Sequence, residues 1–283
     1  MPESLEKISI CEIIMVTVII RVNPLDSERQ ATMKKCAVIL AGGEGKRMQS
    51  EGPKTLCEVL GKPMLRWVID AVREAGIEDI CVVKGYRAEC IDEYVSTLPF
   101  PVHTVLQSER LGTGHAVMMA REYLEERGGS VVILGGDAPF IDAETIKNSL
   151  EQHTSSQAGA TVISATVPCA DGYGRVVRNA DSSLCAIIEH KDADEETRKI
   201  NEINSGAYWF DTNTLLSVLD RITSDNKAKE YYLPDALKLI ISDGKKAGAF
   251  VAKSADVALG ANDPAQLQEL NEIALKKGYK PET

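Results

Sequence analysis

Three short apolar runs constrain the fold of this chain more than any other feature of its sequence. The runs are Cys36–Leu40, Ile80–Val83 and Val131–Leu134, and patterns typical of helices lie between them. Strands of a parallel sheet are covered by helices on both faces, so their side chains are apolar without alternation. We therefore predict an α/β fold, with a Rossmann-like mixed, mostly parallel sheet that is flanked by helices.

The pattern changes after the apolar segment Ala160–Val167. Two segments, Gly174–Arg178 and Leu184–Glu189, are predicted to form a hairpin, and Ile203–Phe210 a further strand. Helices and two more strands complete the expected set, with helices at 63–75, 88–98, 114–127, 212–222, 235–242 and 263–277 and strands at 102–106 and 249–252. The chain has no internal repeat and no long linker, so we expect one mixed α/β domain.

A glycine-rich segment follows the first apolar run and reads Ala-Gly-Gly-Glu-Gly-Lys-Arg over residues 41–47. Glycines let the backbone approach a ligand closely and point N–H groups at it, an arrangement that suits phosphate. Arg47 and Lys54 would supply positive charge. The glycines alone are equally consistent with an ordinary turn between strand and helix, and the two cations favour the phosphate interpretation.

This segment does not match the two best-known phosphate-binding motifs. A Walker A loop requires GxxxxGK[ST], but Leu40 stands where the first glycine should be. A dinucleotide-binding loop requires GxGxxG, but Met48 takes the place of the third glycine. The loop therefore belongs to another class of nucleotide or phosphate site.

Composition narrows the classes of protein further. The 283 residues are 44% hydrophobic and 26% charged, which is typical of a soluble globular protein. The net charge of −10 argues against a nucleic-acid or anionic-membrane surface, yet cations outnumber anions between Lys34 and Arg66, as expected for a small polyanionic ligand. The seven cysteines are dispersed without a CxxC pair, so we expect reduced thiols and a cytoplasmic protein.

Polar residues follow several of the expected strands. The glycine segment follows Leu40, Asp137 follows Leu134 after two glycines, and Glu189 follows Ile188. Ligands of open parallel sheets bind beyond the carboxyl ends of the strands. We therefore expect these residues to lie at one edge of the sheet.

Taken together, the motifs resemble the uridylyltransferase domain of bacterial N-acetylglucosamine-1-phosphate uridylyltransferases, a branch of the sugar nucleotidyltransferases. The resemblance extends from about Lys35 to Gln268. The segments that carry it are LAGGEGKRM (40–48), GPK (52–54), LGKPML (60–65), LQSERLGTGHAV (106–117), GDAPFI (136–141), YGRVVR (173–178), IEHKDA (188–193), EINSG (202–206), EYYLPD (230–235) and GAND (260–263). LGTGHA, the segment around Asn204 and EYYL point to the N-acetylglucosamine branch.

The resemblance implies a GT-A-like nucleotidyltransferase fold and an enzyme with small-molecule substrates. In that reaction UTP and N-acetylglucosamine-1-phosphate give UDP-N-acetylglucosamine, a cell wall precursor, and pyrophosphate, with Mg²⁺ as cofactor. It implies no nucleic-acid or membrane partner, and it leaves the oligomeric state unknown.

The resemblance also implies a role for each matching residue. Arg47, Lys54 and Asp137 would be catalytic. The nucleotide would be bound by Leu40, Ala41, Gly42, Gly43, Arg47, Lys54, Gln107, Gly112 and Thr113, the sugar by Gly174, Glu189, Asn204 and Tyr232, and the metal by Asp137 and Asn262. Structural alternatives remain open, because Asp137 or Asn262 could cap a helix and Glu189 could be a surface charge at the end of a strand.

Physical chemistry agrees with this division of labour. A phosphate monoester has a second pKa of about 6 and is mostly dianionic at neutral pH, so the attacking oxygen needs no general base. The site must instead bring two anions together and neutralise their charge. This predicts cations, a metal carboxylate and backbone donors, without a catalytic histidine.

The resemblance also predicts how the chain is divided. We expect a nucleotidyltransferase domain over 34–263, with a nucleotide-binding half at 34–140 and a sugar-binding half at 141–263, and a helix with a tail at 264–283. Residues 1–33 are an unassigned extension, and Met33 is a possible natural start. Typical members continue into a left-handed β-helix that carries an acetyltransferase, and no such repeat is found here.

Three departures from the resemblance concern specificity. Gly42 stands where the branch usually has Ala, Gly135 where it commonly has Tyr, and Pro234 where a Thr normally follows Tyr-Tyr-Leu. Transfer of another nucleotide or to another hexose-1-phosphate therefore stays open, as does a catalytically silent nucleotide-sugar binder. A molybdopterin nucleotidyltransferase shares the start of the glycine segment, but LGTGHA and EYYL argue against it.

Overall fold

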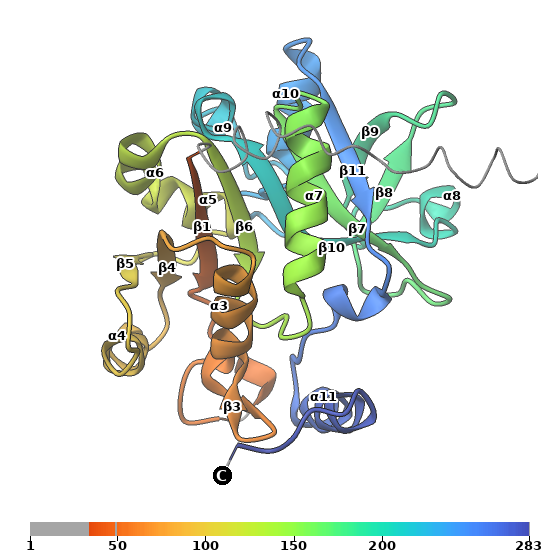
Figure 1. Ribbon diagram of the computed structural model, residues 1–283. Helices are drawn as coiled ribbons and strands as arrows, with labels where there is room; N and C mark the ends of the chain where they lie inside the picture. The colour runs from red at the N-terminus through yellow and green to blue at the C-terminus, as the bar shows by residue number, and fades with distance from the viewer. Residues whose placement is uncertain (1–33, 49, 283) are drawn as a thin grey trace, which may run out of the picture. The chain divides into compact units, whose positions relative to one another are not determined.

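A nine-stranded sheet organises the described part of the chain (Figure 1). The computed structural model describes residues 34–48 and 50–282, so the extension 1–33 and the possible start at Met33 lie outside the described residues. The sheet order is β11-β7-β10-β6-β1-β4-β5, with β8 paired to β10 and β9 to β8. The strands are β1 (Lys35–Ala41), β4 (Ile80–Lys84), β5 (His103–Leu106), β6 (Ser130–Gly135), β7 (Ala160–Thr166), β8 (Arg175–Arg178), β9 (Leu184–Ile188), β10 (Glu202–Asp211) and β11 (Ala247–Val251).

The sheet is mixed and mostly parallel, as predicted. β1 runs parallel to both β6 and β4, β4 is parallel to β5, and β11 is parallel to β7. β10 is antiparallel to β6 and β7, and β8 and β9 form the expected antiparallel hairpin. The three apolar runs became neighbouring central strands, with β1 between β6 and β4, and this register aligns their carboxyl ends.

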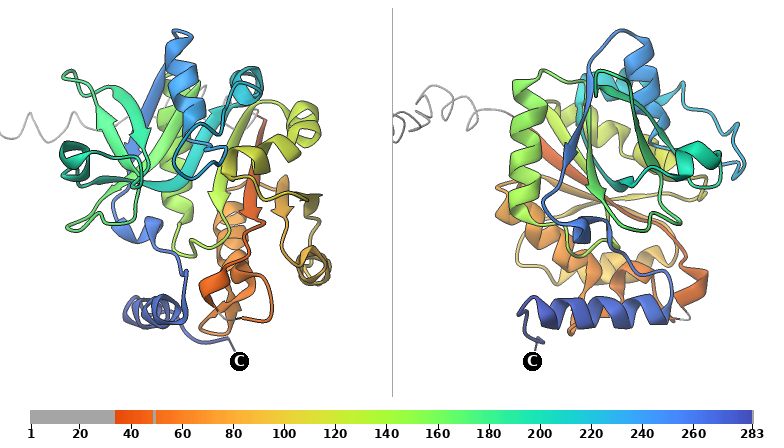
Figure 2. Two further views of the ribbon diagram at one scale, coloured as in Figure 1. Left: turned by 180° about the vertical axis from the view of Figure 1, so that it is seen from behind. Right: turned by 90° about the vertical axis from the view of Figure 1, so that its right-hand side faces the viewer.

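Helices cover both faces of the sheet, as the views from behind and from the side show (Figure 2). Successive residues of β1 point to opposite faces: Ala37 and Ile39 belong to one core cluster, and Cys36 and Val38 to the other. The helices are α3 (Met64–Glu74), α4 (Ala88–Ser96) and α7 (Ala143–Ser155) on the first face, and α5 (Thr113–Met119), α6 (Arg121–Arg127), α9 (Thr212–Leu219) and α10 (Asp235–Ser242) on the second.

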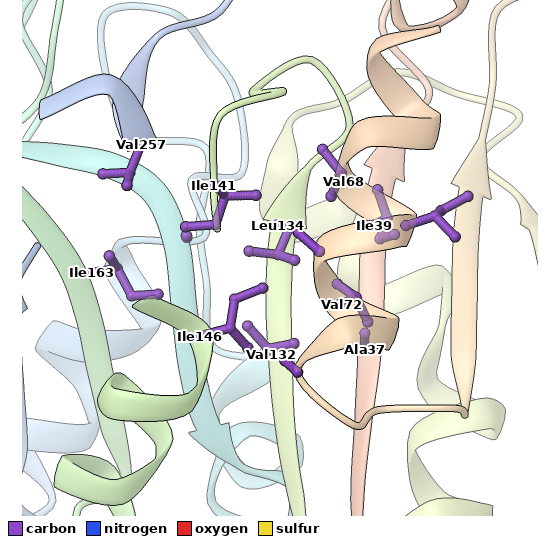
Figure 3. Packing of buried hydrophobic residues seen from close by; sticks show 14 of the residues in the cluster. Ala37, Ile39, Val68, Val72, Val132, Leu134, Ile141, Ile146, Ile163 and Val257 are labelled. Carbon is purple, nitrogen blue, oxygen red and sulfur yellow. The ribbon is translucent and has the colours of Figure 1, made fainter. Parts of the chain in front are cut away.

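The first of these clusters is shown in close-up (Figure 3). Val68 and Val72 of α3 contact the same cluster as Ile39 and Leu134, which lie on the neighbouring strands β1 and β6. Ile146 of α7 joins it from the adjacent helix. All of these side chains are fully or almost fully buried. They therefore pack helices α3 and α7 against strands β1 and β6.

A third, smaller cluster fixes the end of the described chain. Helix α11 (Pro264–Lys276) packs through Leu270 and Ala274 against Met64 and against the short hairpin of β2 (Glu58–Val59) and β3 (Lys62–Pro63). The Leu60 N–H donates a hydrogen bond to Asn271 Oδ1 at 2.8 Å. The hairpin at residues 58–63, which follows the glycine segment, is thereby held to the last helix.

Apart from short elements such as β2, β3 and helix α8 (Glu195–Arg198), which were not expected, the structure differs from the expected elements in two places. The helix expected over 114–127 is divided at Ala120 into α5 and α6, because the backbone there (φ −87°, ψ 9°) leaves the helical range. Helix α7 was not anticipated, since its apolar stripe is weak. Its beginning is marked by Asp142, whose carboxylate accepts a hydrogen bond from the Thr145 N–H.

Candidate active site

A cavity of about 650 Å³ lies at the carboxyl ends of the parallel strands. Gly42 follows β1, Gln107 follows β5, and Asp137 lies two residues after β6. The backbone joins these ends, since Gly136 N–H donates to Leu40 O at 2.9 Å and Gln107 N–H to Lys84 O at 2.8 Å. Of the three features expected at this edge of the sheet, the glycine segment and Asp137 lie at this cavity, and Gln107 joins them there.

Most of the residues expected at the nucleotide and the metal line this cavity. They are Leu40, Gly42, Gly43, Arg47, Lys54, Gln107, Gly112, Thr113, Asp137 and Asn262. Ala41 does not line it, because it is the last residue of β1 and its side chain is buried in the first core cluster.

One cation joins the two residues expected to bind metal. Lys54 Nζ lies 2.5 Å from Asp137 Oδ2 and donates a hydrogen bond to Asn262 Oδ1 at 3.0 Å. The Lys54 side chain is only 13% exposed. A carboxylate oxygen and an amide oxygen from distant segments therefore converge on a single positive charge.

Neither oxygen is committed to capping a helix. Helix α7 is capped by Asp142, five residues beyond Asp137, and α11 by Asp263, whose carboxylate accepts from the Gln266 N–H at 2.9 Å. The Asn262 backbone N–H donates to Gln266 Oε1 at 2.8 Å, which fixes the residue and leaves its side chain for Lys54. The capping alternatives for Asp137 and Asn262 are thus wrong.

These two oxygens match part of the ligand set that a magnesium ion needs. Mg²⁺ prefers hard oxygen ligands, keeps several waters, and is commonly held by one or two protein groups together with phosphate oxygens. Asp137 and Asn262 offer that number and type of ligand. Among the residues that the structure describes, no group of three His, Cys, Asp or Glu side chains gathers to hold a metal without such help.

Glycines allow the polar side chains of the cavity to take these positions. A Cβ atom at Gly135 would lie 2.8 Å from Asp137 Oδ1, and one at Gly42 would lie 2.9 Å from Gln107 Oε1. Gly45, at φ +61°, lies so close to the Lys54 stem that a Cβ there would be 2.7 Å from Lys54 Cβ. Two of the departures from the resemblance, Gly42 and Gly135, are therefore positions where the missing side chain gives space to a polar oxygen.

Gln107 is held from two sides. Its Nε2 donates to Gly112 O at 3.0 Å and lies 3.1 Å from His115 Nδ1. The residue is only 5% exposed, although it lines the cavity. His115 therefore orients an amide that could recognise the edge of a base.

The loop that carries Gly112 and Thr113 is bound to the distant segment 231–233. Gly114 N–H donates to Tyr231 O at 2.7 Å, and the Leu233 N–H donates to Thr113 Oγ1 at 3.0 Å. Gly112 (φ +116°) has no room for a side chain, because a Cβ would lie 2.6 Å from Tyr231 O. The LGTGHA and EYYL motifs are thus one structural unit that joins the two halves of the site.

The residues expected at the sugar form a second cluster beside the cavity. A Cβ at Gly174 would lie 2.9 Å from Glu189 Oε1, and the Asn204 backbone N–H donates to Gly174 O at 2.9 Å. Asn204 Nδ2 donates to Tyr208 Oη at 2.7 Å. None of Gly174, Glu189, Asn204 and Tyr232 lines the cavity itself, but their neighbours Tyr173, Ser205 and Gly206 do.

Burial has the largest effect on the charges of this second cluster. Burial raises the pKa of Glu189 above its usual range, and the nearby carboxylates of Asp192, Asp235 and Glu230 raise it further, against a hydrogen bond from Asn204 that lowers it. Burial, with the same acidic neighbours, also raises the pKa of Tyr232 to about 12. The alternative of Glu189 as an ordinary surface charge does not fit these surroundings.

An ion pair that was not expected joins the glycine segment to a residue that lines the cavity. Arg110 Nη2 lies 3.1 Å from Glu44 Oε2, and Glu44 also lies 3.8 Å from Lys46 Nζ. Arg110 lines the cavity. Both residues fall inside motifs that the sequence analysis singled out. Their pairing could not be predicted from those motifs, because only the fold brings the glycine segment next to the loop after β5.

Comparison with known proteins agrees with this geometry. The family model for nucleotidyl transferases matches residues 36–262. The chain belongs to the nucleotidyl transferase family. Bifunctional protein GlmU of Clostridium botulinum (strain 657 / Type Ba4) is 45% identical over 245 residues, which are 87% of this chain and 53% of that protein.

Other GlmU proteins match to a similar extent. That of Clostridium beijerinckii is 46% identical over 241 residues (85% of this chain, 52% of the relative), and that of Acetivibrio thermocellus is 43% identical over 237 residues (84% and 51%). The chain spans about half the length of the curated relatives it matches. Among its described helices, none has the length and apolar character needed to cross a membrane.

Proposed function

We propose that this nucleotidyl transferase forms UDP-N-acetylglucosamine and pyrophosphate from UTP and N-acetylglucosamine-1-phosphate, with Mg²⁺ as cofactor. One observation carries the proposal: a single cavity has the Lys54–Asp137–Asn262 cluster in its wall, and beside it lies the pair of the half-buried Glu189 and the buried Asn204. The identity to GlmU proteins supports the choice of nucleotide and sugar.

The nucleotide would lie against the carboxyl ends of β1 and β5. Gln107 would hydrogen-bond the edge of the uracil, and Leu40, Gly42 and Gly112 would shape the pocket around it. Arg47, exposed in the short helix Lys46–Met48 that follows the glycines, would bind the departing pyrophosphate. The backbone of Gly43 would approach the phosphates without obstruction, because no atom lies within 4 Å of its missing Cβ.

The reacting phosphates would lie at the Lys54–Asp137–Asn262 cluster. An oxygen of the sugar phosphate attacks the α-phosphorus of UTP, the bond from that phosphorus to the bridging oxygen breaks, and pyrophosphate leaves. Asp137 and Asn262 would hold Mg²⁺, which when bound supplies positive charge to the phosphate oxygens. Lys54 would bridge the two substrates' phosphates and lower the repulsion between them.

No residue needs to remove a proton from the nucleophile. The phosphate dianion is already deprotonated near neutral pH, because its second pKa is about 6. The site would therefore act by orientation and charge neutralisation. His115, whose Nδ1 lies 3.1 Å from Gln107 Nε2, would orient that amide rather than a reacting oxygen.

The sugar would be recognised by hydrogen bonds from the second cluster. Glu189 and Asn204 would bind hydroxyl or amide groups, with the Gly174 backbone and Tyr232 beside them. Gly174 has no side chain, so both the Glu189 carboxylate and a sugar could approach its backbone. We also infer a cytoplasmic role in making cell wall precursors, where the six cysteines of the described residues would stay free thiols.

A panel assay tests the proposal. Pyrophosphate release is measured with each common NTP and with several sugar-1-phosphates, with and without Mg²⁺. We expect the highest kcat/KM for UTP with N-acetylglucosamine-1-phosphate, and no turnover without metal. Turnover with no pair at all would favour a silent nucleotide-sugar binder, against which the intact Arg47, Lys54, Asp137 and Asn262 argue.

A second candidate keeps the reaction and changes a substrate. Gly135 lines the cavity without a side chain, and Gly42 leaves space at Gln107 Oε1. Pro234 follows the EYYL segment, whose backbone is bound to the Gly112–Gly114 loop. A larger kcat/KM with another hexose-1-phosphate or another NTP would favour this candidate.

A further inference from the structure

Lys54 takes the position in which a cation would be bound by Asp137 and Asn262. Its Nζ is the partner of both Asp137 Oδ2, at 2.5 Å, and Asn262 Oδ1, at 3.0 Å. The proposed function assigns Mg²⁺ to these same two residues, and the present inference rests on that assignment. An ammonium group and a divalent cation repel each other and cannot share the same two oxygens at such distances.

The fold holds Lys54 in this position. Its stem packs against Gly45, where a Cβ would lie 2.7 Å from Lys54 Cβ and 3.3 Å from Cγ. The Asp137 carboxylate is accommodated by Gly135 in the same way, with 2.8 Å between the missing Cβ and Oδ1. Asn262 is fixed by its backbone hydrogen bond to Gln266. The side chains of Lys54, Asp137 and Asn262 therefore lose little further conformational entropy when they contact one another.

We propose that Lys54 competes with divalent metal for Asp137 and Asn262, so that the protein binds metal tightly only together with a nucleoside triphosphate. A triphosphate offers anionic oxygens to which the Lys54 ammonium can move, and the same oxygens add ligands for the metal. Without them, removal of Lys54 from the two oxygens would leave its charge next to a second cation. Lys54 thus couples metal binding to nucleotide binding, in addition to its proposed role at the reacting phosphates.

The coupling gives Lys54→Met an unusual expected effect. Removal of a cation from a binding site that later holds anions should weaken nucleotide binding, but the same change should strengthen binding of metal alone. A purely structural role for Lys54 would not produce a gain in metal affinity. The sign of this change therefore separates the proposal from a packing defect.

Mn²⁺ binding to the full-length protein without nucleotide is measured by electron paramagnetic resonance, with Mn²⁺ as the probe. We expect Lys54→Met to bind one Mn²⁺ at least tenfold more tightly than the unsubstituted protein. In the double variant Lys54→Met/Asp137→Asn the gain should vanish, which assigns the gained ion to this site. Lys54→Ala serves as a second test should Lys54→Met unfold, as judged by circular dichroism.

The chain offers a matched control for loss of a partly buried lysine–aspartate pair. Lys62 Nζ lies 2.5 Å from Asp70 Oδ2, with side chains 15% and 35% exposed, against 13% and 32% for Lys54 and Asp137. Lys62→Met removes the same charge away from the cavity and should leave Mn²⁺ affinity unchanged. A gain in Lys62→Met equal to that in Lys54→Met would overturn the proposal, because net charge alone would then explain it.

The nucleotide arm measures the coupling itself. A non-hydrolysable UTP analogue should raise the Mn²⁺ affinity of the unsubstituted protein more than that of Lys54→Met. No gain of Mn²⁺ affinity in either Lys54 variant, or a gain that survives Asp137→Asn, would refute the inference. These readouts need no turnover, so failure of the sugar-transfer assay would overturn the proposed function and leave this result to stand or fall separately.

Discussion

The phosphate end and the sugar end of the candidate site treat a carboxylate in opposite ways. Asp137, at the phosphate end, has an ammonium group 2.5 Å away. Glu189, at the sugar end, has a pKa that is raised by burial and, to a smaller extent, by Asp192, Asp235 and Glu230, and within the described residues no ion pair joins it. A site that binds polyanions needs fixed positive charge, whereas a site that recognises a neutral sugar needs hydrogen-bonding groups in a less polar setting.

The largest effect should come from breaking the charged end. Asp137→Ala and Lys54→Ala each remove a group that we assign to the reacting phosphates, and kcat should fall by about 10²–10³-fold or more, as for loss of one transition-state-stabilising group. Pyrophosphate release measures the rate, and circular dichroism checks that the fold is intact. Near-normal kcat in either variant would show that its residue does not take part in the reaction.

Glu189→Gln tests the sugar end and should act on a different substrate. Loss of a hydrogen bond to a charged group is worth about 1.5–3 kcal/mol, so kcat/KM for the sugar phosphate should fall about ten- to a hundredfold while the KM for UTP stays nearly constant. Steady-state kinetics with each substrate varied in turn measures this. An equal rise in both KM values would contradict the division into two ends.

The same variant should have the opposite effect on stability. Burial raises the pKa of Glu189 in the folded protein, so the folded state binds more protons than the unfolded state and stability falls as pH rises through this range. Glutamine carries no such charge. The free energy of unfolding of Glu189→Gln should therefore exceed that of the unsubstituted protein by an amount that grows from about pH 4, near the pKa of an unfolded glutamate, to neutral pH.

Denaturant unfolding at both pH values measures this difference. Its absence at neutral pH, or a difference that grows as the pH is lowered, would show that burial does not penalise the charged carboxylate.

Gln107→Ala sharpens the comparison within the nucleotide half. A neutral hydrogen bond is worth about 0.5–1.5 kcal/mol, so the preference for UTP over other NTPs should fall by up to about tenfold. The kcat with UTP at saturation should change little, because Gln107 does not contact the phosphates in the proposed mode. The ratio of kcat/KM for UTP and CTP gives the measurement, and an unchanged ratio would remove Gln107 from base recognition.

The smallest effect concerns the Glu44–Arg110 ion pair beside the cavity. Its side chains are 31% and 44% exposed, so the coupling between them should be only about 0.2–1 kcal/mol and should weaken with salt. A double-mutant cycle of Glu44→Gln and Arg110→Gln on the KM for UTP measures this coupling at low and high salt. Additive effects at both salt concentrations would show that the pair does not contribute to the KM for UTP.

Much of the fold and of the phosphate end could be predicted from residues close in sequence. The three apolar runs indicated a parallel sheet, and the rule that ligands bind beyond its strand ends placed Gly42 and Asp137 at one edge. The divided helix at Ala120 and the whole of α7 were less visible, because tertiary packing rather than a strong apolar stripe maintains them. The roles of all these residues stay predictions until the variants are tested.

The fold class, the family resemblance and the residue types of both ends could be predicted from the amino-acid sequence alone, because strand patterns and motifs depend on local spacing. Which groups meet depends on the tertiary structure. The fold brings Asn262 to Lys54 across more than two hundred residues, places Gly135 against the Asp137 carboxylate, joins Glu44 to Arg110 and partly buries Glu189. Charge pairing and burial depend on distance in space, and local spacing along the chain does not contain that distance.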